Sequence, residues 1–387
     1  MPLTARPLWL VGFRPFFALA CLAGLSLPLV WIALFTGELR LAPADFSIIQ
    51  WHAHEMFFGF GWAVMGGFLL TSTKNWVHIR GYHGAPLVFL AAAWLLERAG
   101  MWWAARLPPL LFQLSINLYM VAIVAMLLWT LLRHRDEDTF KWDNTYFLAV
   151  LPSFLVGKHL LLSPAHFQLG VSVTTGLFRM AFLVMLERTL TQFMKGVYQV
   201  QILRSPLLDN AIKGLGLVLV FERLLPAPLS GGVALLLAAL LLVRFCFWKP
   251  QLALRRLDLG IMYLGYLAIA AQLIIVFLDQ VVRPAWVGTV SVHVFTFGVM
   301  GLIIPAMLVR IFKGHTGRKV QFAPADKVVL WVMMLGFGLR IVAPQLVPAR
   351  YLLWLWLAAA CWFAAFSLLA WRYVPYVLQA RVDGKEH

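Results

Sequence analysis

Charged residues are scarce in this chain, and their scarcity excludes most soluble folds. Of 387 residues, 12% are charged and 62% are hydrophobic, and the mean hydropathy is +0.83. Apolar runs of about 20 residues, the length that crosses a bilayer as a helix, recur along the whole sequence. Ten-residue segments of alternating polarity, which indicate a membrane β-barrel, are lacking. We therefore expect an all-α, polytopic integral membrane protein in a lipid bilayer.

Acidic residues are also few, with 16 Asp and Glu against 32 Lys and Arg, and the formal net charge is +16. A nucleic-acid partner would require basic residues gathered on one amphipathic face or arm. They lie instead between the apolar runs, which is typical of topology signals in membrane proteins. We expect no nucleic-acid partner.

Cysteine is rare, because Cys21, Cys246 and Cys361 are the only three and they are isolated. Their spacing favours neither a disulfide nor a zinc site. The motif C-x-x-C-H is missing, so any haem would be held without thioether bonds. We find no secretory signal peptide with a charged n-region and a cleavage site between small residues, so we expect the first helix to act as an uncleaved signal sequence.

The apolar runs predict twelve spans joined by short connections that often begin with Pro or Gly. We therefore expect residues 1–387 to form a single transmembrane domain. The predicted spans are 15–37, 50–73, 84–105, 107–133, 143–163, 168–188, 206–225, 228–248, 258–280, 286–310, 326–343 and 348–374.

Lys and Arg are concentrated at both termini and in every second connection, including a sixth connection with Arg188, Lys195 and Arg204. The other connections together hold only five arginines, namely Arg40, Arg106, Arg223, Arg283 and Arg350. Because positive charge is retained on the cytoplasmic side, this bias places both termini in the cytoplasm. A multi-pass protein of a bacterial inner membrane is expected.

The stretch WHAHEM, residues 51–56, opens the second span with two histidines. Positions i and i+2 of a helix differ by about 200° in direction, so His52 and His54 face different places. His52 shares its face with Glu55 and Met56, a ligand set that suits copper or a mixed metal site. His54 shares its face with an aromatic wall that a planar cofactor could approach. If the first turn is frayed, both imidazoles serve one metal instead.

His293 lies inside the tenth span, in VSVHVFTFG, where a polar side chain is costly. It lies roughly 10 Å below the outer surface, given the rise of 1.5 Å per residue. We expect His52, His54 and His293 to converge on one metal or cofactor site near the periplasmic side. The alternative is a neutral imidazole that is hydrogen-bonded to a neighbouring helix.

Several ionisable or polar residues fall within or at the ends of spans, where they face the bundle interior or a wet cavity. Arg179 lies deepest and is expected to pair with a haem propionate, with Glu97 or with Glu187. Glu55 and Glu97 are candidate catalytic proton donors. Interhelical ion pairs and snorkelling from span ends are the alternatives. The full set comprises Glu97, Arg98, Asn117, Lys158, Arg179, Lys213, Glu222, Arg223 and Arg340.

Five motifs resemble those of the NnrS family. They are GFRPFF (12–17), WHAHEMFFGF (51–60), GGFLLTSTKNW (66–76), VHVFTFGVMG (292–301) and GHTGR (314–318). The resemblance implies a bacterial inner-membrane protein with haem b and copper, which acts in nitric oxide metabolism and protects against nitrosative stress.

The resemblance also implies that the functional histidines are His52, His54, His293 and His315. The predicted orientation places His315 on the cytoplasmic side, away from the others. For GHTGR we therefore favour a turn in which Gly314 and Gly317 relax the backbone and His315 or Arg318 caps a helix. A second, inner metal site at His315 is the alternative.

Three functions are open at this point. The first is an oxidoreductase that binds nitric oxide on haem and reduces it, with Glu55 as proton donor and an unknown electron donor. If two histidines filled both axial positions, the haem would transfer electrons without binding gas. The second function is a non-catalytic protein that binds or senses nitric oxide, haem or copper. The third is a secondary transporter.

Overall fold

The computed structural model describes residues 3–40 and 46–385, and no strand occurs in this part of the chain. The chain divides into two compact units. Unit 1 comprises Met1–Phe167, Met307–Asp326 and Trp362–His387, and unit 2 comprises Gln168–Ala306 and Lys327–Cys361. The predicted single transmembrane domain stays a prediction, and each unit is described by itself.

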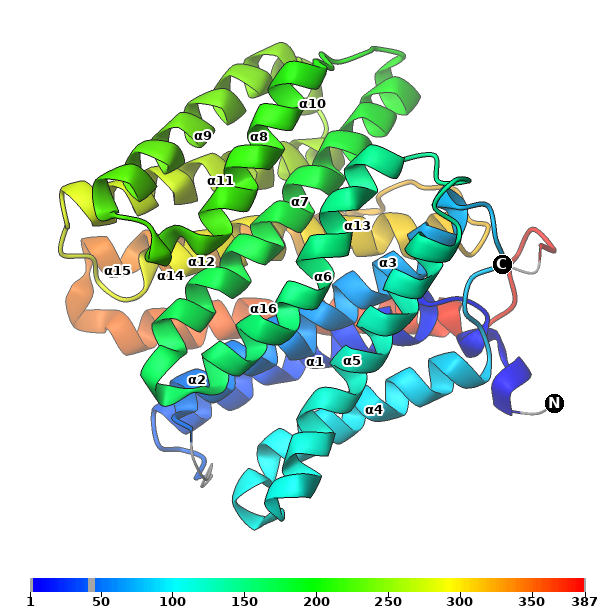
Figure 1. The fold of residues 1–387 in the computed structure, drawn as a ribbon, viewed down its shortest axis with the longest axis horizontal. Coiled ribbons are helices and arrows are strands. Elements are labelled where there is room, and N and C mark those ends of the chain that lie inside the picture. Colours follow the sequence, from blue (N-terminus) through cyan, green and yellow to red (C-terminus); the bar gives the residue numbers. More distant parts are fainter. Residues whose placement is uncertain (1–2, 41–45, 386–387) are drawn as a thin grey trace. The chain divides into compact units, whose positions relative to one another are not determined.

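Unit 1 begins with α1 (Phe13–Phe35) and a long broken helix, α2 (Ile48–His54), the π-helical η3 (Glu55–Gly61) and α3 (Trp62–Trp76). It continues with α4 (Ala85–Trp102), α5 (Pro109–Arg133) and α6 (Lys141–Leu162). The end of α13 (Leu302–Gly314) and the end of α16 (Tyr351–Val377) complete it. Helices α1 and α3 pack together, as do α4 and α5 (Figure 1).

Unit 2 holds α7 (Phe167–Tyr198), α8 (Pro206–Val218), the 3₁₀ segment η6 (Leu219–Leu224) and α9 (Ala227–Phe247). After the short α10 (Pro250–Ala253), α11 (Leu257–Val281) packs against α9. A second broken helix follows, made of α12 (Val290–Phe295), the π-helical η7 (Thr296–Gly301) and α13. The unit ends with α14 (Pro324–Ile341), the short α15 (Ala343–Leu346) and the first half of α16.

The all-helical, multi-pass class is confirmed, because ten described helical stretches are long and apolar enough to cross a bilayer. The predicted third and seventh spans are not among them. Helix α4 has 18 residues but carries Glu97 and Arg98, and α8 has only 13 residues. The count of twelve therefore stays a prediction for these two segments.

Helix α7 is longer than predicted, because it ends at Tyr198 rather than at residue 188. Arg188 and Lys195, which the sequence placed in a connection, belong to this helix. The segment ERTLTQFMK contains no Pro or Gly, and Glu, Arg, Leu, Gln and Met favour helix, so nothing local stops the helix there. Charge alone was a misleading boundary signal.

The start of α1 and the end of α16 meet at one end of unit 1. Arg14 Nη1 donates to the carbonyl oxygens of Val377 at 2.9 Å and Gln379 at 2.7 Å. Beside it, Phe13 N donates to Thr71 Oγ1 at 2.8 Å. Which side these ends face stays a prediction.

A buried ion cluster joins four helices of unit 2. Glu187 on α7 binds Arg204 Nη2 at 2.5 Å and Arg244 Nη1 at 3.1 Å. Asp209 on α8 binds the same two arginines, and Arg244 Nε donates to Tyr266 Oη on α11 at 3.0 Å. These contacts satisfy charges that would otherwise be costly inside a membrane.

Candidate functional site

The helix that carries WHAHEM has a fixed start. Ser47 Oγ accepts from Gln50 N at 3.2 Å, and Gln50 Oε1 accepts from Ser47 N at 2.8 Å, which is a capping box. The Gln50 amide also donates to Leu162 O at 3.2 Å, at the end of α6. The first turn of α2 is therefore well formed, and His52 and His54 keep the different directions of a regular helix.

The two histidines have different surroundings. His52 is half-buried and stacks on Trp31 of α1, with ring centroids 4.2 Å apart and an angle of 26° between the planes. His54 is fully buried. Its Nδ1 lies 3.0 Å from Glu55 Oε1, and its Nε2 lies 3.2 Å from Glu97 Oε1. The structure thus brings His54 together with both candidate proton donors.

Glu55 turns toward His54 and Arg98, whereas the helical pattern placed it beside His52. Arg98 Nε lies 2.8 Å from Glu55 Oε2, so both oxygens of this carboxylate have partners. Glu55 keeps α-helical backbone angles, φ −64° and ψ −37°, so the conformation of its side chain brings the carboxylate to His54. Met56 is half-buried on η3. The copper site on His52, Glu55 and Met56 stays a prediction.

Two cations balance the carboxylates. Lys158 of α6 lies with Nζ 2.5 Å from Glu97 Oε1 and also donates to Ile116 O of α5. Arg98 Nη2 lies 3.4 Å from the same Glu97 oxygen. With His54 uncharged, the charges of the five groups sum to zero. This group, His54, Glu55, Glu97, Arg98 and Lys158, is called the His54 cluster below.

The segment η3 shapes the cluster. A π-helix makes i to i+5 hydrogen bonds and leaves some carbonyls without a helical partner, and such turns are frequent at functional sites. Here Gly59 O accepts from Trp94 Nε1 of α4 at 3.1 Å. A Cβ on Gly59 would lie 2.9 Å from Arg98 Nη1, so the glycine lets the guanidinium approach the backbone.

His293, in unit 2, is held by Thr289 and Arg340. Its Nδ1 lies 2.8 Å from Thr289 O, and its Nε2 lies 3.1 Å from Arg340 Nη2. Because a guanidinium can only donate, Nε2 acts as the acceptor, and we assign the proton to Nδ1. The Nε2 lone pair, the one that ligates metals in this tautomer, therefore points toward Arg340. Its convergence with His52 and His54 stays a prediction.

The second histidine motif also precedes a π-helical turn, η7. Both motifs read H-x-x-x-F-G, with Phe58 and Gly59 after His54, and Phe297 and Gly298 after His293. A Cβ on Gly298 would lie 3.0 Å from Ala268 Cβ, so this glycine also permits close packing. Neither π turn was predicted, although the repeated motif indicates a shared local structure.

Arg179 of α7 is buried in unit 2, and Glu222 is its acidic partner. Its guanidinium donates to Gln272 Oε1 and Leu219 O, both at 2.9 Å, and lies 3.5 Å from Glu222 Oε2. Gln272 Nε2 in turn donates to Ser291 Oγ on α12, two residues from His293. The predicted pair with Glu187 is wrong, because Glu187 belongs to the ion cluster with Arg204 and Arg244. A haem propionate as partner stays a prediction.

His315 lies in a turn at the other end of α1 from His52. Its ring is 5.4 Å from Phe13, whereas His52 stacks on Trp31, about 27 Å farther along α1 at 1.5 Å per residue. Gly317 has a φ of +81°, and Arg318 N donates to Lys313 O at 2.9 Å, which closes α13 in a Schellman motif. His315 therefore does not belong to the His54 cluster, and the inner metal site stays a prediction.

Burial lowers the pKa of His315 to about 4, and the nearby positive charges of Lys74 and Arg381 act in the same direction. Between pH 6.5 and pH 4, His315 is therefore protonated in the unfolded chain, where its pKa is ordinary, but neutral in the folded chain. We expect the folded state to lose stability as the pH falls from 6.5 to 4, by about 3 kcal/mol at most. His315→Gln should flatten this part of the stability curve, measured by denaturant unfolding across that range. Parallel curves for the two proteins would contradict the prediction.

Metal ligands are sparse in this structure. In residues 3–40 and 46–385, no three His, Cys, Asp or Glu side chains are placed to hold one metal ion. A preassembled copper centre of three such ligands is therefore not found in the described chain. A haem needs only one or two protein ligands, so this finding does not bear against it.

The fold and the His54 cluster define an all-helical, multi-pass membrane protein with a buried, charge-balanced histidine and carboxylate site. The family model described as NnrS protein matches residues 7–381. The chain belongs to the NnrS family, and the resemblance seen in its motifs is confirmed. No curated protein matches the sequence.

Proposed function

We propose that this protein binds haem b and reduces nitric oxide in the bacterial inner membrane, at a site toward the periplasmic side. Membership supports, for the NnrS family as a whole, a nitric-oxide-related protein associated with haem and copper. The observation that carries the proposal for this chain is the buried His54 between two carboxylates, directly before a π-helical turn.

The imidazoles fit a haem better than a multi-ligand copper site. A ligating histidine usually gives its second ring nitrogen to a carboxylate or a backbone carbonyl. A carboxylate lies at each ring nitrogen of His54, so either nitrogen can bind iron while the other keeps its carboxylate partner. His293 already donates from Nδ1 to Thr289 O, so its Nε2 is the nitrogen for iron. His54 and His293 are therefore each a proposed haem ligand, with Arg340 released from Nε2 where His293 binds iron, and Arg179 is the proposed propionate partner. For the catalytic function only one histidine holds a given iron, so that nitric oxide has a position.

Haem iron, when bound, supplies the site where nitric oxide is held and through which an external donor delivers electrons. Reduction of two nitric oxide molecules to nitrous oxide and water consumes two electrons and two protons. Glu55 and Glu97 would hold and pass those protons at the His54 ring, since each has an oxygen within 3.2 Å of a ring nitrogen. Arg98 and Lys158 would keep the two carboxylates in place while Glu55 and Glu97 gain and lose protons.

A non-catalytic binding protein is the second candidate, and the covered ring nitrogens favour it. Glu55 and Glu97 contact both nitrogens of His54, and Arg340 contacts Nε2 of His293. If two histidines bound one iron, no position would be left for gas. Copper on the His52 face would suit either function.

Optical spectra of the purified, reduced protein test the proposal. We expect a haem b spectrum that shifts on addition of nitric oxide or carbon monoxide, and nitrous oxide when a reductant is supplied. Glu55→Gln should keep the gas-induced shift and slow nitrous oxide formation, whereas Glu38→Gln, an exposed acid elsewhere, should change neither. A haem spectrum that gas leaves unchanged would remove the catalytic function in favour of the binding protein. A protein without haem would remove both.

A further inference from the structure

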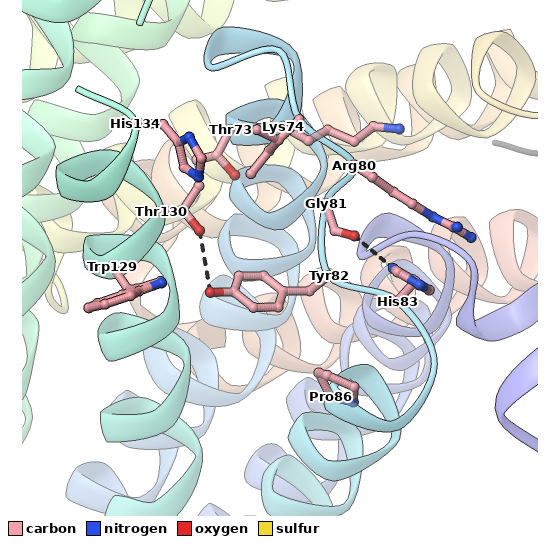
Figure 2. A pocket seen from close by; sticks show the side chains of 11 residues that line it. Thr73, Lys74, Arg80, Gly81, Tyr82, His83, Pro86, Trp129, Thr130 and His134 are labelled. Atoms are coloured by element: carbon pink, nitrogen blue, oxygen red, sulfur yellow. Dashed lines mark hydrogen bonds between the residues drawn. The ribbon is translucent and has the colours of Figure 1, made fainter. Parts of the chain in front are cut away.

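Unit 1 contains a cavity of about 240 Å³ that the proposed function does not use. It lies where the end of α3, the connection to α4, the start of α4 and the end of α5 meet (Figure 2). Lys74, Arg80 and His83 line it from the α3 side, and Trp129 and His134 line it from α5. By the distribution of positive charge, this end of the helices is predicted to face the cytoplasm.

Hydrogen bonds hold the wall of the cavity in place. Tyr82 Oη donates to Met126 O at 3.1 Å and lies 3.4 Å from Thr130 Oγ1. His83 Nδ1 lies 3.0 Å from Gly81 O. Figure 2 shows the Tyr82 ring reaching from the connection toward Thr130 of α5. The connection is thereby fastened to α5, and the cavity is a fixed feature of the surface.

The rim of the cavity is basic. Of the eleven lining residues, all in the described chain, two are Lys or Arg, two are His and none is acidic. Lys74 and Arg80 extend to one side of the connection, and His134 approaches from α5 on the other (Figure 2). Glu137 is a carboxylate next to this rim, and its Oε2 lies 2.9 Å from His134 Nδ1. An anionic group at the rim is therefore favoured.

The outer wall continues into an apolar surface. Trp129 is 66% exposed, and Leu114, Val121 and Leu132 are also exposed on α5. These positions recur at helical spacing and form one stripe along the helix. A tryptophan at the end of such a stripe is typical of the headgroup level of a membrane. A ligand in the cavity can thus have an anionic head at the rim and hydrocarbon along α5.

We propose that this cavity binds an anionic glycerophospholipid, with its phosphate at Arg80 and His83 and one acyl chain extending to the α5 stripe. Basic pockets between membrane helices on the cytoplasmic side bind anionic headgroups. A free phosphate would use the same basic rim but would leave Trp129 and the apolar stripe without a role. The lipid accounts for both.

Thermal unfolding of the full chain in detergent, titrated with phosphatidylglycerol or with phosphatidylcholine of the same acyl chains, tests this site. We expect phosphatidylglycerol to raise Tm more than phosphatidylcholine. Arg80→Gln should raise about fivefold the phosphatidylglycerol concentration that gives half of the maximal increase in Tm, as expected for the loss of one basic residue near an anionic headgroup. Arg133→Gln removes the same charge from the neighbouring end of α5, outside the cavity, and should leave the phosphatidylglycerol effect unchanged.

A second variant separates the cavity from general charge. Pro86→Trp fills the opening without changing charge and should also weaken the phosphatidylglycerol effect. Equal effects of the two lipids, or wild-type behaviour of both Arg80→Gln and Pro86→Trp, would overturn the proposal. Equal protection by inorganic phosphate would also overturn it, because an anion alone would then suffice.

Discussion

Replacement of Lys158 by methionine is expected to reduce the free energy of unfolding by about 3–5 kcal/mol, the usual result when one partner of a buried ion pair is removed. Lys158 and Glu97 are both fully buried, with Nζ and Oε1 2.5 Å apart. Methionine has similar volume and no charge, so it leaves the Glu97 carboxylate with His54 and Arg98 alone. Denaturant unfolding in mixed micelles, followed by tryptophan fluorescence, measures the loss.

Two variants make this result specific. Lys158→Met combined with Glu97→Gln removes both charges, and it should recover most of the lost stability, because no uncompensated charge remains. Lys195→Met, on the exposed side of α7, should change stability by only about 0.5 kcal/mol. If Lys158→Met unfolds at the wild-type denaturant concentration, the charge balance assigned to the His54 cluster is wrong.

His54→Ala is expected to lose haem almost completely during purification. A haem b held without thioether bonds depends on its axial ligands, and alanine supplies neither a ligand nor the polar link between Glu55 and Glu97. Glu55→Gln should weaken haem binding less, by about 10–100-fold, as for other groups that orient a metal ligand. The ratio of haem to protein, from pyridine haemochrome absorbance, gives the occupancy.

His52→Ala is the matched control, because it lies two residues away and stacks on Trp31 outside the cluster. It should retain haem near the wild-type level. His293→Ala should lose haem as His54→Ala does if both serve as ligands. Full haem in both His54→Ala and His293→Ala would refute the proposed ligands, provided that both variants are folded.

Much of the fold followed from the sequence, because the bilayer restricts what an apolar run can do. Runs near 20 residues must be helices there, and most predicted spans match observed helices within a few residues. Failures occurred where charge was taken as a boundary. Lys195, which was placed in a connection, lies within α7, whereas Glu97 and Arg98, which were placed inside a span, lie in α4.

The site was predicted in its residues but not in its contacts. His54 and Glu97 were predicted because a polar side chain inside a membrane span is costly and therefore indicates a function. This rule applies to single residues and does not predict their partners. The pairing of Glu97 with Lys158 joins residues far apart in sequence, and no local pattern encodes it. Glu55 was grouped with His52 by helical spacing, but in the structure its carboxylate contacts His54 and Arg98.

The contact between Arg14 and the end of α16 also bears on how the chain is made. Arg14 leaves the ribosome long before its acceptors, the carbonyls of Val377 and Gln379, which follow it by 363 and 365 residues. Until then a fully buried guanidinium lacks these two partners. During synthesis α1 therefore remains without these contacts until α16 has been made, and a chain that stops shortly before residue 377 leaves the Arg14 guanidinium without them.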